Sequence, residues 1–209
     1  MIHMDVTLFP TKGNLILAKN TLALSSQGYE LLDKKRNILV REMMELIDKA
    51  KDIQSKIEIT FAQAYAVLQR ANIAVGIGHV EAIGHAMPLE DSVAIMSRSV
   101  MGSDIPRVSY NEGALLPGYG FYSAASALDE ACMRFREVKR LSIELAEVES
   151  AVYRLAVNIK KTQKRANALK NVTIPRYRQI TAGIQSVLEE KEREEFTRLK
   201  VIKARKENN

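Results

Sequence analysis

The sequence contains few of the residues that end helices or cross-link chains. Its 209 residues include no tryptophan, one cysteine and five prolines, and aromatic residues make up only 6%. A single thiol, Cys132, cannot form an internal disulfide, which excludes a disulfide-stapled scaffold and favours a reducing, cytoplasmic setting. Few aromatic residues disfavour a β-sandwich or barrel, whereas 46% hydrophobic residues are enough for an ordered core. The expected fold class is therefore all-α.

Signals for export or membrane insertion are also missing. The chain does not open with a charged and then apolar leader that ends in a small-residue cleavage site. The uncharged stretch 113–128 contains Pro117 and three glycines, and it is shorter than the ~18 to 20 apolar residues of a spanning helix. We therefore expect no transmembrane segment.

Motifs for catalysis or cofactor binding are absent as well. No G-x-x-x-x-G-K-[ST] run occurs, and residues 78–85 (GHVEAIGH) lack the lysine and hydroxyl residue of a phosphate-binding loop. His79, Glu81 and His85 in that segment match no common spacing of zinc ligands. The carboxylates of residues 189–195 alternate with basic residues at helical spacing, which is typical of a solvated helix face. The sequence predicts a non-enzymatic protein without catalytic, cofactor-binding or metal-binding residues.

Each half of the sequence has a long apolar periodicity. From Thr11 to Ala74 there is no proline, and apolar residues recur at alternating steps of three and four. The predicted seam residues are Leu32, Leu39, Met43, Leu46, Ile53 and Ile57 in the first half, and Leu141, Leu145, Val148, Val152, Leu155, Ile159 and Leu169 in the second. Because both halves belong to one chain, we expect them to fold back on each other as a long antiparallel two-helix coiled coil.

The helix-breaking residues divide the chain into three predicted segments. These are an N-terminal coiled-coil arm at 11–75, a middle section at 76–121 that holds most of the glycines, and a C-terminal coiled-coil arm at 122–206. Within the middle section, Ser92–Met101 and Ile105–Tyr110 have strand-like composition on either side of turn residues at Gly102–Asp104. We expect a short β-hairpin near 92–110.

The C-terminal arm has two further features. Pro175 removes a backbone donor and crowds the preceding turn, so we expect a kink or break near Thr173–Arg176. This arm also exceeds the N-terminal arm by about 30 Å at ~1.5 Å per residue. Its end is expected to project as a nearly single helix or to need another protein to cover it.

The charge pattern suggests a surface that contacts a partner. The net charge is +6, and no acidic residue occurs between Glu149 and Glu189. Predicted partner contacts in or near this stretch are Lys160, Lys161, Lys164, Arg165, Arg176 and Arg178. A surface with charges of one sign repels itself unless an acidic surface faces it, so these residues are predicted to contact a partner.

Three other interpretations of this basic stretch remain open. They are an exposed basic face without a dedicated partner, a basic coiled-coil adaptor, or a nucleic-acid-binding architectural protein. Only Tyr153 and Tyr177 could stack on bases in this stretch, which gives nucleic-acid binding little support.

Several strings in the sequence, in order, resemble a known family. They are Pro10-Thr11-Lys12 with Leu15, residues 28–36 (GYELLDKKR), 145–149 (LAEVE), 161–169 (KTQKRANAL) and Ile174-Pro175. This order and spacing resemble the D subunit of V-type and archaeal-type rotary ATPases over nearly the whole chain. Lys12 and Lys170 depart from the family pattern, which more often has arginine and an acidic residue there.

The resemblance implies a central-stalk rotor shaft that has no cofactor and is not itself an enzyme. The implied partners are the catalytic and regulatory ring subunits (A and B), the small F subunit of the stalk and a C-type (d-type) rotor adaptor, with no nucleic acid. The shaft would couple rotation to ATP synthesis or hydrolysis and to ion transport. It would lie on the cytoplasmic side of the membrane, peripheral to it, as part of the complex.

Overall fold

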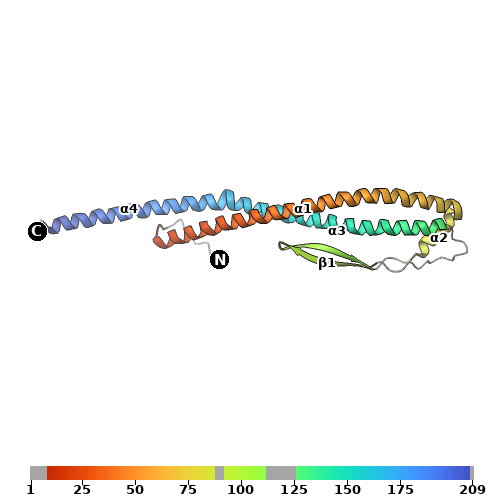
Figure 1. The fold of residues 1–209 in the computed structure, drawn as a ribbon. Coiled ribbons are helices and arrows are strands. Elements are labelled where there is room, and N and C mark those ends of the chain that lie inside the picture. The colour runs from red at the N-terminus through yellow and green to blue at the C-terminus, as the bar shows by residue number, and fades with distance from the viewer. Residues whose placement is uncertain (1–8, 88–91, 112–125, 208–209) are drawn as a thin grey trace. The chain divides into compact units, whose positions relative to one another are not determined.

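The structure, a computed structural model, describes residues 9–87, 92–111 and 126–207 (Figure 1). Its elements are α1 (Lys12–Val75), α2 (Ile77–Ala86), β1 (Val93–Val100), β2 (Ser103–Tyr110), α3 (Ser126–Ala168), the π-helical turn η1 (Leu169–Thr173) and α4 (Ile174–Glu207). The prediction of an all-α fold with a short β-hairpin is confirmed. The expected boundary between the middle section and the C-terminal arm, at 121 and 122, lies outside the described residues.

The chain divides into two compact units, which are described separately. The first contains residues 1–37 and 160–209, and the second contains residues 38–159. In both units the first helix of the chain packs against helical residues from its second half. The second unit also includes α2 and the hairpin.

In the second unit, α1 and α3 run antiparallel. Lys49 forms an ion pair with Glu144 at 2.8 Å, and Tyr65 meets the ring of Phe135 edge to face at 5.5 Å. Residue numbers therefore rise along α1 as they fall along α3. At residues 38–60 and 138–159 the buried side chains, apart from Ala151, follow the predicted alternation of three and four, which allows the two helices to bury a continuous stripe.

The second unit has two apolar clusters. One joins Leu39 of α1, Ala151 and Leu155 of α3, and Ile105 of β2, and both leucines are fully buried. The other joins Ala71 of α1, Ile83 of α2 and Leu128 of α3. Both clusters hold a third element against the helix pair, so the hairpin and α2 belong to the core of this unit.

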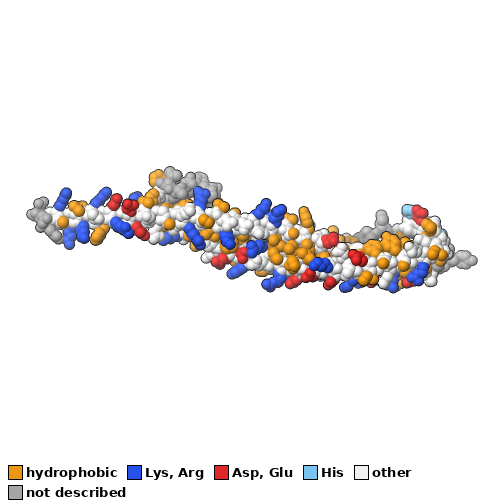
Figure 2. Space-filling view, turned by 90° about the horizontal axis from the view of Figure 1, so that it is seen from above, with side chains coloured by type: hydrophobic (Ala, Val, Ile, Leu, Met, Phe, Trp, Pro, Cys, Tyr) orange, Lys and Arg blue, Asp and Glu red, His pale blue; other side chains and the backbone are white. Residues whose placement is uncertain are grey.

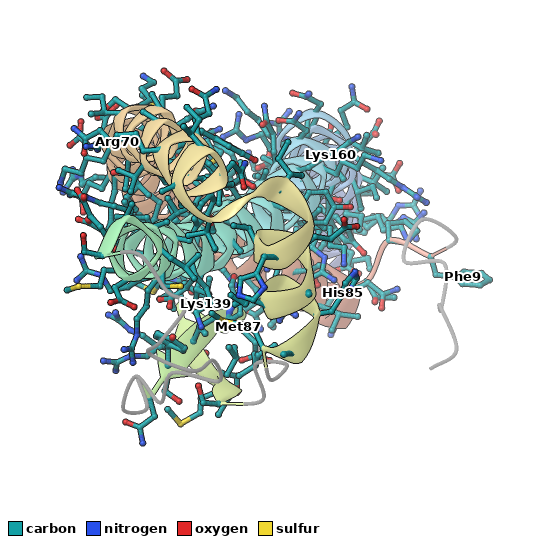
Figure 3. All side chains as sticks on the ribbon, turned by 90° about the vertical axis from the view of Figure 1, so that its right-hand side faces the viewer. Phe9, Arg70, His85, Met87, Lys139 and Lys160 are labelled. Carbon is teal, nitrogen blue, oxygen red and sulfur yellow. The ribbon has the colours of Figure 1, made fainter. Side chains whose placement is uncertain are left out.

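Helix α2 is a short element that the periodicity did not predict. Gly76 separates it from α1 with a φ of 95°, a conformation that glycine adopts without strain. This reversal brings the apolar face of α2 back to the end of the helix pair, where Ile83 is buried. Figure 3 shows α2 beside that pair, with His85 near its end.

The hairpin is a two-stranded antiparallel sheet in which Val100 pairs with Ser103. A turn of two residues connects the strands, with φ of 50° at Met101 and 70° at Gly102. Positive φ at both positions matches the right-handed twist of the strands. The expected turn at Gly102–Asp104 is therefore wrong by one to two residues, because the closing pair already includes Ser103.

The first unit is also antiparallel. Lys12 forms an ion pair with Glu192 at 2.9 Å, and the Lys170 ammonium lies 5.6 Å from the centre of the Tyr29 ring. Gly28 faces Leu169, because a Cβ added to this glycine would lie 3.7 Å from the leucine Cδ1. The buried residues of this unit are small or β-branched, namely Ala18, Thr162, Ala166, Ile174 and Ile184.

The helix does not break before Pro175. Instead, the chain forms the π-helical turn η1, in which the Ile174 N–H donates to the Leu169 carbonyl five residues earlier. The wider turn moves Pro175 away from the position where its ring would crowd a carbonyl group. The additional residue in this turn also shifts the later buried positions by one residue along the sequence. Past η1 the buried and half-buried positions are 174, 177, 180, 181, 184 and 188. The earlier alternation would continue through 173, 176, 180, 183 and 187, of which 176, 183 and 187 are exposed and only 173 and 180 are half-buried.

Candidate interaction surfaces

The predicted seam residues lie in the interior of the helix pairs. Leu39, Ile53, Leu141, Val148 and Leu155 are buried. The half-buried members are Leu32, Met43, Leu46, Ile57, Leu145, Val152, Ile159 and Leu169. None of them is left on an exposed face.

The predicted partner-contact residues all lie on the surface. The exposed set comprises Lys160, Lys161, Lys164, Arg165, Arg176 and Arg178, all in the first unit. Within the part of the chain that the structure describes, none of these side chains forms an ion pair. Lys160 and Lys164 are four residues apart on one helix, as are Lys161 and Arg165, and like charges at this spacing destabilise a helix. These four residues, called the basic patch below, would gain from an acidic neighbour.

Two basic residues of the acid-free stretch do have partners. Arg154 donates a hydrogen bond from Nη1 to the Asp104 carbonyl at 3.2 Å, which ties α3 to β2 in the second unit. Lys170 lies over the Tyr29 ring in the first unit. Lys12, at the start of α1, pairs with Glu192. Lys170 and Lys12 therefore both contact a side chain of another helix.

The end of α4 is a second exposed surface. Lys12, at the start of α1, pairs with Glu192, and α4 continues to Glu207 beyond that point. All residues from 193 to 206 are exposed, including the apolar side chains Phe196, Leu199, Val201 and Ile202. Figure 2 shows apolar side chains between charged ones at this end of the helix. The prediction of an unpaired C-terminal end agrees with these residues, which we call the α4 tip.

The ammonium group of Lys12 has a perturbed pKa. A hydrogen bond from Lys12 to Glu192, together with the attraction between their charges, raises the pKa of the Lys12 ammonium. Both side chains are largely exposed, so this pair serves as a marker of the antiparallel register and contributes little to stability.

Groups that could carry chemistry are dispersed. Among the described residues there is no cluster of three or more histidine, cysteine or acidic side chains suited to a metal ion. His79 and His85 occupy the two ends of α2, and Cys132 is half-buried in α3. Within the same residues, no helix combines the length and apolar character needed to cross a bilayer.

Sequence reasoning missed the contacts that fix the hairpin on α3. The Val108 N–H donates to Glu147 Oε2 at 2.9 Å, and the Lys139 ammonium lies 5.4 Å from the centre of the Tyr110 ring. Figure 3 shows Lys139 beside the hairpin. No pattern in the sequence relates residues 29 and 39 positions apart in this way, although Glu147 lies in one of the strings that carry the resemblance, residues 145–149.

These features define an antiparallel coiled-coil protein whose exposed surfaces, rather than a cluster of reactive groups, are suited to function. The family model for the D subunit of ATP synthase matches residues 14–204. The V-type ATP synthase D subunit of Thermotoga neapolitana is 42% identical over 198 residues, which cover 95% of this chain and 98% of that protein. The A-type ATP synthase D subunits of Methanosphaera stadtmanae and Pyrococcus furiosus are 36% and 35% identical, each match covering 93% of this chain and 92% of the relative. The chain belongs to the family of ATP synthase D subunits.

Proposed function

We propose that this chain is the central rotor shaft of a V-type or A-type ATP synthase. It is a non-catalytic subunit that couples rotation to ATP synthesis or hydrolysis in a catalytic ring and to ion transport across the membrane. The antiparallel helix pair is the observation that carries the proposal. Two helices joined along a buried seam resist twisting and bending better than one, and a shaft must transmit torque without unwinding.

The exposed surfaces support a mechanical and allosteric role. A shaft that presents different side chains in different directions would favour different states in otherwise equivalent ring interfaces, which is how rotation and nucleotide turnover would be coupled. The basic patch offers such a surface to the A and B subunits of the ring. The α4 tip offers apolar side chains that a surrounding ring would shield from water.

The remaining partners follow from the same role. The small F subunit of the stalk would bind the side of the shaft, and a C-type (d-type) adaptor would receive the end at which α1 passes into α2. The protein would then be peripheral to the membrane, on its cytoplasmic side, through these contacts. Membership of the family over nearly the full chain supports these assignments.

The first test is a pull-down of the full chain from its own cells, with a tag in the section between α1 and α3. Recovery of ring subunits together with ATP hydrolysis in the eluate is the expected result. Recovery of nucleic acid, or of an unrelated protein without ATPase activity, would contradict the proposal.

A second test addresses the surface. Reversing the basic patch to glutamate should weaken assembly with the ring at moderate salt, because the reversed charges would repel an acidic partner. A matched control reverses four exposed basic residues on α1 that also form no ion pair with any described residue, namely Lys19, Lys34, Arg41 and Lys56. Equal assembly of both variants would show that the basic patch is not a contact surface.

A further inference from the structure

The two edges of the hairpin differ in what covers them. The outer edge of β2 is occupied by α3, because Val108 donates its N–H to Glu147 and Asp104 accepts from Arg154. In contrast, β1 is exposed along its length except at Val100, which is half-buried. Within the described residues, no hydrogen bond joins the outer edge of β1 to another element. The sheet therefore has one closed edge and one open edge.

The register identifies the backbone groups on the open edge. Val108 sends its N–H outward to Glu147, so its partner Ile95 also directs its N–H and carbonyl outward. Pairs of this kind alternate along an antiparallel ladder, which gives Val93, Ile95, Ser97 and Ser99 as the outward-facing residues of β1. Pro106 supports the assignment independently. It pairs with Ser97 and has the same outward direction, where a missing N–H costs no ladder bond.

The open edge lacks the devices that usually protect one. Exposed edge strands normally carry several charges, a proline or a bulge that prevents further pairing. The strand β1 has no proline, its only charged residue is Arg98, and its register with β2 is continuous. Its exposed apolar side chains include Ile95, at 74% of full exposure, and Met96, at 55%.

These features favour an extended strand as the occupant of the edge. A helix has its own N–H and C=O groups already bonded, so it could cover side chains of β1 but could not pair with its backbone. The charges add a second criterion. Arg98 pairs with Ile105 and Met96 pairs with Arg107, so both guanidinium groups lie on one face of the hairpin. In the part of the chain that is described, neither arginine has an ion-pair partner.

We propose that β1 is a docking edge for an extended segment of another subunit of the complex. The segment adds to the hairpin as a third strand, with an apolar residue against Ile95 and an acidic residue near Arg98. Opposite charges and apolar side chains in neighbouring strands form favourable cross-strand pairs. This inference rests on the proposed function, since it requires the chain to assemble with other subunits.

The structure supplies a selective variant. Ser97→Pro removes an outward N–H and places a ring on the open edge, while the bonds between β1 and β2 are retained, as they are at Pro106 on the opposite strand. Ser97→Ala is the matched control, because it shortens the same side chain and keeps the N–H. Arg98→Pro removes an N–H that bonds β1 to β2, so it serves as a reference for the exchange pattern of a disrupted hairpin.

The experiment measures amide hydrogen exchange at single-residue resolution, in the isolated full chain and in the purified complex that contains it. In the isolated chain the outward amides of Val93, Ile95, Ser97 and Ser99 should exchange quickly. In the complex they should slow by about tenfold or more, the equivalent of one net hydrogen bond each. In a complex assembled with the Ser97→Pro chain, the other outward amides should remain fast, and the Ser97→Ala chain should behave as the unsubstituted chain does.

The other outcomes overturn the inference in distinguishable ways. Fast outward amides in an intact complex, or protection that survives Ser97→Pro, would show that no strand adds to β1. Protection already present in the isolated chain would mean that the chain itself or a second copy occupies the edge, and the oligomeric state of the free chain separates these two. If no ring subunits co-purify with the unsubstituted chain, the proposed function fails and the inference fails with it.

Discussion

The π-helical turn η1 should be removable if two changes are made together. It contains one residue more than a regular helix needs to keep the seam in phase, so deleting Asn171 would return the later seam residues to the uninterrupted alternation of three and four. Asn171 is exposed, and its loss removes no seam contact. The deletion would, however, return Pro175 to a regular helix, where its ring clashes with a carbonyl group at a cost of about 3 kcal/mol. Deletion of Asn171 with Pro175→Ala should therefore lie within about 1 kcal/mol of the original chain.

A deletion past the turn gives the contrast. Removing Gln179, which is equally exposed, rotates every later residue by about 100° and takes Thr181, Ile184 and Leu188 off the seam. Burial of one isoleucine or leucine contributes about 1.5 to 3 kcal/mol, so the loss should be about 2 to 4 kcal/mol once half-burial of Leu188 is allowed for.

The assay is amide hydrogen exchange in the first unit, combined with thermal unfolding followed by circular dichroism. Exchange at Ile184 reports on this unit even if the two units unfold separately. The expected order of stability is the original chain and the double variant together, then the Asn171 deletion alone, with the Gln179 deletion also well below the original. If the double variant is as unstable as the Gln179 deletion, the turn does not act as a register shift and this reasoning is wrong.

Three further predictions concern single contacts. Leu155→Ala should lower the free energy of unfolding by about 2 to 5 kcal/mol because this side chain is fully buried. Leu199→Ala on the exposed α4 tip should change the free energy of unfolding by less than about 0.5 kcal/mol. Denaturant titration measures both values. Gly28→Ala should raise the free energy of unfolding by about 0.5 to 1 kcal/mol, because alanine favours the helix and its methyl group lies at an ordinary contact distance of 3.7 Å from a leucine side chain. A lower denaturation midpoint than that of the original chain would contradict this prediction. Glu192→Gln should lower the raised pKa of Lys12, and NMR titration of the Lys12 side chain measures this change. In the original chain, the stabilisation from the ion pair is present below the ordinary lysine pKa and is lost as the pH rises through the higher pKa of the folded state.

The helix pairs could be predicted because their signal is local and repeated. Each seam residue is spaced from the next by three or four positions, and a stripe of that kind buries itself only against another helix. The same rule applied past Leu169 fails, because it cannot detect the residue that η1 inserts. Pro175 marked the place of the irregularity, but the choice between a break and a π-helical turn depends on whether Ile174 and Ile184 can reach the seam.

The smaller elements were less predictable for a different reason. The hairpin strands were located by composition, yet their turn was misplaced, because Met101 adopts a positive φ that is uncommon for a residue other than glycine. Helix α2 was missed because its glycines resemble a loop, while its position depends on Ile83 reaching a cluster that α1 and α3 form. Surface contacts such as Glu147 with Val108 join distant parts of the chain, and periodicity contains no information about them.

The charges of the basic patch repel one another in the free chain, and this repulsion leads to a last prediction about the effect of salt. The patch holds two like-charge pairs at a spacing of four residues, each costing about 0.2 to 0.5 kcal/mol in a free helix. Salt screens this repulsion, so the isolated chain should become more stable as ionic strength rises. In the complex the same charges would face an acidic surface of a partner subunit. Salt would then screen the attraction between the two surfaces, so the complex should dissociate more readily as the ionic strength rises. Melting of the free chain and dissociation of the complex, measured over one salt series, should therefore move in opposite directions. If both strengthen with salt, apolar contacts such as those of the α4 tip dominate the assembly and the basic patch is only a solvated face.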